Sequence, residues 1–189
     1  SVAQFAEAFK TKYDRLDVLV NNAGLSLPVR HLSDEGLEMM FAINHLGPFA
    51  LTCLLAESLK ASGMARVVCV ASMGHWMGRM DMDNLQGERN FNSLAQYCNT
   101  KLANILFARA LAERVRHQNI TSYSLHPGVI RSGFAQDESG WFGKLVKVGG
   151  PFMSTPEKGA RTSIYLATAP GIESHSGHYF ANSKKAMCS

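Results

Sequence analysis

A tyrosine and a lysine four residues apart are the first pair in this sequence that could do acid–base chemistry. Tyr97 and Lys101 fall in a pattern that predicts a helix over residues 93–117, so their side chains share one helix face. A cation about 4 Å from a phenol, at an effective dielectric of about 20, favours the tyrosinate by about 4 kcal/mol. We therefore expect Lys101 to lower the pKa of Tyr97 by roughly three units, into the range useful for proton transfer. The alternative is a half-buried tyrosine beside a lysine that extends to solvent.

Two more polar residues, Ser72 and Asn44, could join this pair. Ser72 follows a buried apolar run at residues 66–71 and could hydrogen-bond a ligand, although strand-end serines are also common in plain turns. Pro48 has no N–H, so the carbonyl of Asn44 loses its usual i+4 donor. A buried carbonyl needs another donor, most simply a water. We expect Asn44 to hold a water near the tyrosine–lysine pair; the alternative is a helix kink without a chemical role.

Apolar runs alternate with helical patterns along the chain, and this order predicts the fold. Strands are predicted at residues 16–20, 66–71, 120–125 and 177–181, and helices near the start, from Ser33 or Asp34 to about Ala61, at 93–117 and at 156–167. Near-continuous apolar strands separated by helices indicate an α/β, doubly wound parallel sheet covered on both faces. In such sheets the ligand crevice lies at the carboxyl ends of the strands. Those ends here are residues 21–24, Ser72 and residues 127–128.

Composition excludes several other classes of protein. The 189 residues suit a single domain, and 46% hydrophobic with 18% charged residues is a globular composition. The net charge of +4 comes from scattered residues, so nucleic-acid binding is not expected, and no apolar run could cross a bilayer. Four cysteines and seven histidines show no metal-binding spacing, although His75, His126 and His178 could reach the crevice. We expect no metal site.

Taken in order, these segments resemble the short-chain dehydrogenase/reductase family over nearly the whole chain. Residues 21–24 (NNAG) look like the family's segment after a strand, Asn44 like its helix asparagine and Ser72 like its serine. Tyr97 and Lys101 match its YxxxK pair, and residues 127–128 its PG turn. The segments INHLGPF (43–49), YCNTKLANILFARAL (97–111), HPG (126–128) and GHYFAN (177–182) are similar to the retinol dehydrogenase-like branch.

The resemblance implies a Rossmann-type fold and a nicotinamide-dependent oxidoreductase. Tyr97 would exchange a proton with the substrate oxygen, Lys101 would lower its pKa and bind the nicotinamide ribose, Ser72 would bind the substrate oxygen, and Asn44 would hold a relay water. The cofactor, NADP with NAD as the alternative, would contact Asn22, Ala23, Gly24, Tyr97, Lys101, Pro127, Gly128, Val129 and Ser132. The substrate would be a small apolar alcohol, aldehyde or ketone of retinol or retinal type, enclosed by an apolar loop at residues 129–156.

The start of the chain departs from the family pattern. Ser1 opens directly on a helical stripe formed by Val2, Phe5, Ala6 and Phe9, and residues 1–189 contain no Gly-x-x-x-Gly-x-Gly phosphate-binding turn. We expect residues 1–189 to form one partial domain, incomplete at its N-terminus. The alternative function is a catalytically inactive, truncated binding or interaction protein on the same fold. The oligomeric state stays open. An intracellular site is expected, cytoplasmic or at the endoplasmic-reticulum membrane if the longer protein carries an anchor.

Overall fold

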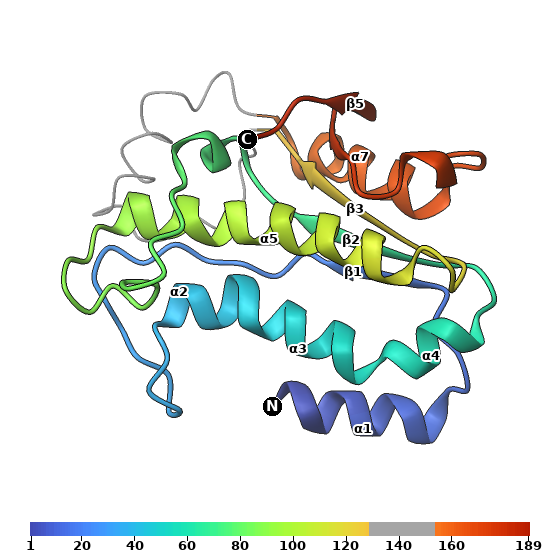
Figure 1. The fold of residues 1–189 in the computed structure, drawn as a ribbon, viewed down its shortest axis with the longest axis horizontal. Coiled ribbons are helices and arrows are strands. Elements are labelled where there is room, and N and C mark those ends of the chain that lie inside the picture. Colours follow the sequence, from blue (N-terminus) through green and yellow to red (C-terminus); the bar gives the residue numbers. More distant parts are fainter. Residues whose placement is uncertain (129–153) are drawn as a thin grey trace.

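One sheet of five strands organises residues 1–128 and 154–189, the parts of the chain that the computed structural model describes (Figure 1). The strands lie in sequence order: β1 (Val18–Asn21), β2 (Ala65–Val70), β3 (Ile120–His126), β4 (Tyr179–Ala181) and β5 (Lys184–Ala186). The first four are parallel, and β5 runs antiparallel to β4. The predicted α/β sheet is confirmed, with the carboxyl ends of β1, β2 and β3 at one edge.

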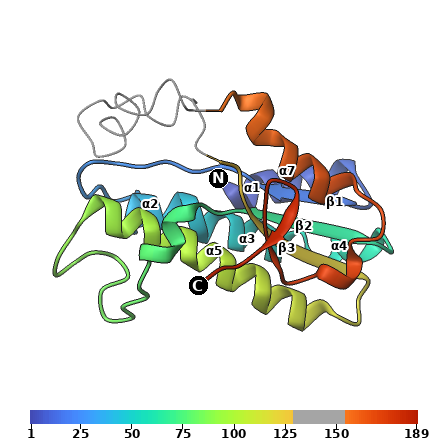
Figure 2. The ribbon, with the colours of Figure 1, turned by 90° about the horizontal axis from the view of Figure 1, so that it is seen from above.

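Helices cover both faces of this sheet, as Figures 1 and 2 show. On one face lie α3 (Gly47–Leu54), α4 (Ala56–Ala61) and the long α5 (Ser93–Val115), with α1 (Val2–Lys12) packed outside α3; α7 (Pro156–Thr168) covers the other face. Short turns of helix add α2 (Met39–Phe41), η1 (Ala42–Leu46), η2 (Met73–Met77) and η5 (Glu173–His175). None of the helices in the described parts is both long and apolar enough to span a lipid bilayer.

The central strand β2 packs against other elements on both faces of the sheet. All six of its residues are buried. Ala65, Val67 and Cys69 pack toward α4 and α5, and Val68 and Val70 pack toward α7 and β4. A strand with both faces against helices must be apolar on both faces, and this is why its sequence runs without alternation.

The single helix expected over residues 34–61 is wrong, because the segment is divided into α2, η1, α3 and α4. It begins at Glu38, not at Ser33 or Asp34: the Glu38 carboxylate accepts the N–H groups of Met40 and Phe41 at 2.9 and 2.8 Å and caps α2. The η1 segment is a π-helical turn, in which the Gly47 N–H bonds back to the carbonyl of Ala42. The wide turn lies directly before Pro48, which cannot donate to residue 44.

A fifth strand, β5, was not predicted. Its sequence, Lys-Lys-Ala, carries no β-forming pattern, and the strand is set by the turn before it. Asn182 and Ser183 both have positive φ, 50° and 57°, which is the backbone of a tight hairpin turn and folds β5 back onto β4.

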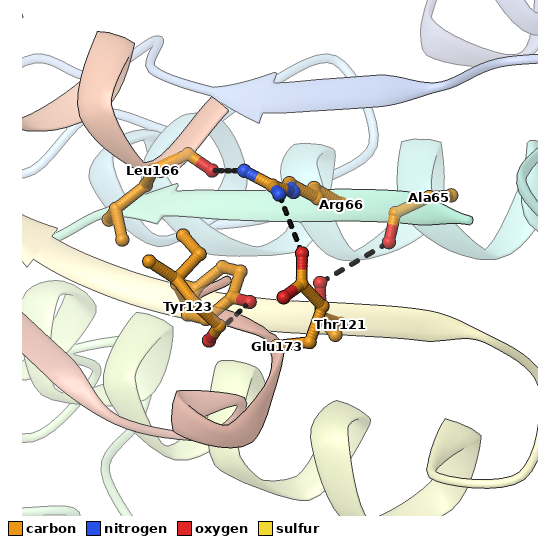
Figure 3. Close-up of polar contacts among 7 residues, drawn as sticks. Ala65, Arg66, Thr121, Tyr123, Leu166 and Glu173 are labelled. Atoms are coloured by element: carbon orange, nitrogen blue, oxygen red, sulfur yellow. Dashed lines mark hydrogen bonds and ion pairs between the residues drawn. The ribbon is translucent and has the colours of Figure 1, made fainter. Parts of the chain in front are cut away.

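Arg66 is the charged residue within β2, and it is 8% exposed. Its Nη1 donates to the carbonyl of Leu166 in α7 at 3.1 Å, and its Nη2 to Oε1 of Glu173 in η5 at 2.8 Å. Figure 3 shows this contact next to the bonds from Thr121 to the Ala65 carbonyl and from Tyr123 to the Ile172 carbonyl. The guanidinium therefore joins the central strand to the helix that covers it.

Replacing Glu173 by Ala removes the carboxylate from a nearly buried guanidinium. We expect Glu173→Ala to lower the free energy of unfolding by about 2 kcal/mol, because Arg66 is then left with a single carbonyl partner. The double variant Arg66→Met, Glu173→Ala should recover part of that loss. Urea denaturation of the chain measures both.

The control is Glu113→Ala, which breaks the exposed Arg116–Glu113 pair, whose side chains are 63% and 77% exposed. Its cost should stay within about 0.5 kcal/mol. If Glu113→Ala and Glu173→Ala lower the free energy of unfolding equally, the proposed stabilising role of the buried Arg66–Glu173 pair is wrong.

Candidate active site

Three loops at the carboxyl edge of the sheet meet the first turns of α5, and the predicted residues lie there. Asn22, Ala23 and Gly24 follow β1, Ser72 lies two residues after the end of β2, and Pro127 and Gly128 follow β3. Val129, Ser132 and all but the end of the predicted substrate loop at 129–156 lie outside the described residues.

Tyr97 and Lys101 occupy one buried face of α5. They are 6% and 3% exposed, and Nζ of Lys101 lies 5.6 Å from the centroid of the Tyr97 ring. The helix begins at the Asn92 N-cap, whose side chain accepts the N–H of Ala95. The predicted pairing on one helix face is therefore present. The alternative, a lysine that extends to solvent, does not agree with the burial of Lys101.

The predicted direction of the Tyr97 pKa shift is wrong. Burial raises the pKa of Tyr97 to about 12, and the hydrogen bond with Ser72, which lowers it, only partly offsets this. Burial also lowers the pKa of Lys101 to about 8. The prediction counted the attraction between a cation and a phenolate but not the cost of removing both from water, and in this site desolvation is the larger effect.

Ser72 lies in hydrogen-bonding relation to Tyr97. Its backbone is extended, and its Oγ accepts the N–H of Gly74 at 3.2 Å, which caps η2. A methyl group on Gly74 would lie 3.6 Å from both Ser72 Oγ and Tyr97 Cε1. The two hydroxyl-bearing side chains, 25 positions apart in sequence, therefore reach one small region of the crevice edge.

Gly24 brings the loop after β1 against the same region. A Cβ at this position would lie 3.1 Å from Nζ of Lys101 and 3.3 Å from Oδ1 of Asn44. Contacts of 3.1 to 3.3 Å are too short for an ordinary methyl group. Glycine therefore lets the loop after β1 approach the buried ammonium group of Lys101 and the Asn44 amide closely.

Asn44 is fully buried in η1, and its side chain fixes the loop after β1. Its Oδ1 accepts the N–H of Leu25 at 2.7 Å, and its Nδ2 donates to the carbonyl of Leu25 at 2.9 Å and to Oγ1 of Thr100 at 3.1 Å. Its own carbonyl accepts Nδ2 of Asn104 at 2.9 Å. We expected a water as a donor to this carbonyl; the Asn104 amide takes one of the two acceptor positions of its oxygen.

Asn104 escaped the sequence reasoning, whereas His75 was named there as a histidine that could reach the crevice. Asn104 lies three residues after Lys101, so helical spacing alone places it on the same face, and that signal was available. His75 is fully buried, and its Nδ1 lies 2.6 Å from the Ser72 carbonyl, which accepts from it. The contact between His75 and the Ser72 carbonyl depends on the η2 turn, which has no sequence pattern of its own.

Comparisons with known proteins agree on one family. A family model described as short chain dehydrogenase matches residues 1–141. The chain is 41% identical over 191 residues to Retinol dehydrogenase 11 of Mus musculus, and 40% identical over 189 residues to Retinol dehydrogenase 12 of Homo sapiens. Each match covers 100% of this chain and 60% of the relative. The chain therefore spans about 60% of the length of these curated relatives.

A solved structure shows the same fold. The crystal structure of an uncharacterized protein from Mycobacterium Paratuberculosis superposes with a TM-score of 0.70 and 31% sequence identity. The superposition covers 95% of this chain and 57% of that one.

The buried amine predicts a pH-dependent gain in stability when Lys101 is replaced by Met. Because the pKa of Lys101 is about 8 in the folded chain and 10.5 ordinarily, the unfolded state binds more protons between these values, and wild-type stability rises with pH there. At pH 7 the folded chain bears the full cost of burying the ammonium group. Lys101→Met should then raise the free energy of unfolding by up to about 3 kcal/mol, and the gain should vanish above about pH 10.5.

Urea denaturation of both chains from pH 7 to pH 11 measures this difference. Lys60→Met, at an exposed lysine of α4, is the matched control and should show no such gain. A Lys101→Met chain that is less stable than wild type at pH 7 would contradict the burial cost.

Proposed function

The chain belongs to the short chain dehydrogenase family, and we propose that the protein containing it is an oxidoreductase of apolar alcohols and carbonyl compounds, retinol and retinal being the substrate type. The names of its relatives, Retinol dehydrogenase 11 and 12, support this substrate class. The observation that carries the proposal is the buried Tyr97 hydrogen-bonded with Ser72 at the carboxyl edge of the sheet.

The residues present fit a nicotinamide cofactor, which the family implies. Lys101 has three N–H donors, and its contact among the described residues is a long bond of 3.4 Å to the Val70 carbonyl. Its remaining donor capacity is available to hydroxyl groups of a bound ribose. Asn22, Ala23, Pro127 and Gly128, with Val129 and Ser132, complete the proposed contacts. We assign NADP as the preferred cofactor, with NAD as the alternative; when bound, it supplies the hydride.

The high pKa of Tyr97 determines which form of the phenol is present at neutral pH. A phenol with a pKa of about 12 is protonated at neutral pH, so it is ready to donate to a substrate oxygen. Ser72 Oγ, fixed by the Gly74 N–H, orients the same oxygen with its own O–H. Proton donation accompanies reduction of a carbonyl, so protonated Tyr97 is the form that the reduction of an aldehyde or ketone requires.

The proposed role of Lys101 follows from its position. As an ammonium group 5.6 Å from the Tyr97 ring centroid, it stabilises the phenolate left after the proton is donated. Its pKa of about 8 keeps it largely charged at neutral pH. The alternative of a non-catalytic interaction protein has no observation in its favour.

The test is NADPH-dependent reduction of all-trans-retinal by the full-length protein. The rate is measured from the decrease in NADPH absorbance. Tyr97→Phe removes the donated proton and should lower kcat by at least about 100-fold, with an unchanged thermal melt. NADH in place of NADPH tests the cofactor assignment, and a lower kcat/KM is expected with NADH.

The matched control is Tyr13→Phe, at a tyrosine that is 49% exposed and lies outside the crevice. It should keep the wild-type rate. Absence of turnover by the wild-type protein with either cofactor would refute the function, and a wild-type rate for Tyr97→Phe would remove Tyr97 from the mechanism.

A further inference from the structure

We propose that Asn104 is a positioning residue of this site, whose single carboxamide holds Asn44, Lys101 and the end of β2 in register. The proposal rests on the proposed function, because it assigns Asn104 a part in that reaction. None of the family motifs quoted for the site includes this residue as a functional group.

The contacts of Asn104 reach all three elements that carry the site. It lies on α5, is 3% exposed, and shares a helix face with Tyr97 and Lys101. Its Nδ2 donates to the Asn44 carbonyl in η1 at 2.9 Å and to the Val70 carbonyl, the last residue of β2, at 3.3 Å. One amide group therefore connects α5, η1 and β2.

Lys101 shares one of these acceptors. Its Nζ donates to the Val70 carbonyl at 3.4 Å, alongside Nδ2 of Asn104. Two donors on one carbonyl fix the lysine relative to the asparagine, and Val70 lies two residues before Ser72. A shift of Asn104 would therefore also displace Lys101 and the end of β2, which precedes Ser72.

A neighbouring histidine sets the orientation of the amide. Oδ1 of Asn104 lies 3.0 Å from Nδ1 of His45. Since Nδ2 faces two carbonyls, Oδ1 must be the acceptor here, so Nδ1 of His45 carries the hydrogen. Protonation of His45 leaves that donor in place, so the orientation survives a change in its charge.

The direction of the hydrogen bonds excludes a proton relay through this group. Lys101 and Asn104 both donate to the Val70 carbonyl, and Asn104 also donates to the Asn44 carbonyl. A backbone carbonyl that only accepts cannot pass a proton onward. Asn104 therefore acts by holding its neighbours in place.

Loss of these bonds would release the region that Pro48 already weakens. The Asn44 carbonyl has no i+4 helical donor, because Pro48 stands four residues later. Without Asn104, two buried carbonyls lose a donor, and η1 and the Lys101 side chain can shift. A displacement of about 1 Å at a reacting group can cost about 100-fold in rate.

Asn104→Leu and Asn104→Asp test the donor, because both keep the size of the side chain and lose the N–H groups. We expect each to lower kcat for retinal reduction by about 100-fold, while the KM for retinal stays within about threefold, since Asn104 contacts the site residues rather than the crevice. The matched control is Asn99→Leu, also on α5, which loses a bond from the Arg79 N–H and should keep the wild-type kcat.

A second measurement is independent of turnover. In cofactor-free full-length protein with ¹³C-labelled lysine, NMR titration should find Lys101 with a midpoint near the pKa of about 8. Asn104→Asp should raise that midpoint by about one unit or more, because a carboxylate held beside an ammonium group stabilises its charge. If wild-type protein has no activity, the proposed function fails. The titration then still tests whether the Asn104 side chain lies close to the Lys101 ammonium group.

An unchanged Lys101 midpoint in Asn104→Asp, or a wild-type kcat in Asn104→Leu and Asn104→Asp, overturns the proposal. Should the Asn104 variants fail to fold, His45→Phe replaces them, because it removes the bond that orients the amide and keeps an aromatic ring among Phe41, Phe49 and Phe107. It should lower kcat by about fivefold, and a wild-type rate for it would also overturn the proposal.

Discussion

A missing backbone hydrogen at Pro48 is the constraint on which the site depends. It prevents a regular helix from satisfying the Asn44 carbonyl, so the chain widens into a π turn at η1 and the carbonyl finds its donor in α5. That contact crosses from one helix to another and links η1 to α5. The Asn44 side chain then holds the loop after β1, which brings Gly24 against Lys101.

Desolvation dominates the electrostatics of the crevice. Tyr97 and Lys101 both lose their water, and each moves toward its neutral form. The phenol becomes a weaker acid, and its pKa moves away from physiological pH. The amine becomes a weaker base, and its pKa moves toward physiological pH. The site therefore holds a phenol with a raised pKa beside an amine with a lowered pKa.

Much of this arrangement could be predicted from the sequence, and the exceptions have physical causes. The strands around Val68, the serine after β2 and the Tyr97–Lys101 face follow from periodicity and spacing, which are local. The sign of the Tyr97 pKa shift depends on burial depth, which arises only when distant segments pack. The π turn before Pro48 and the hairpin at Asn182 are backbone solutions that no hydrophobic pattern encodes. Asn104 was accessible from helical spacing, but its partners were not.

The buried amine at position 101 sets a conflict for laboratory evolution. A library of this domain screened for heat tolerance alone would enrich sequences with an uncharged residue there, because the fold gains by losing the ammonium group. Such survivors would be robust scaffolds without the group that lies beside Tyr97. Selection schemes on this fold therefore need a functional filter in every round, applied before thermal challenge rather than after it.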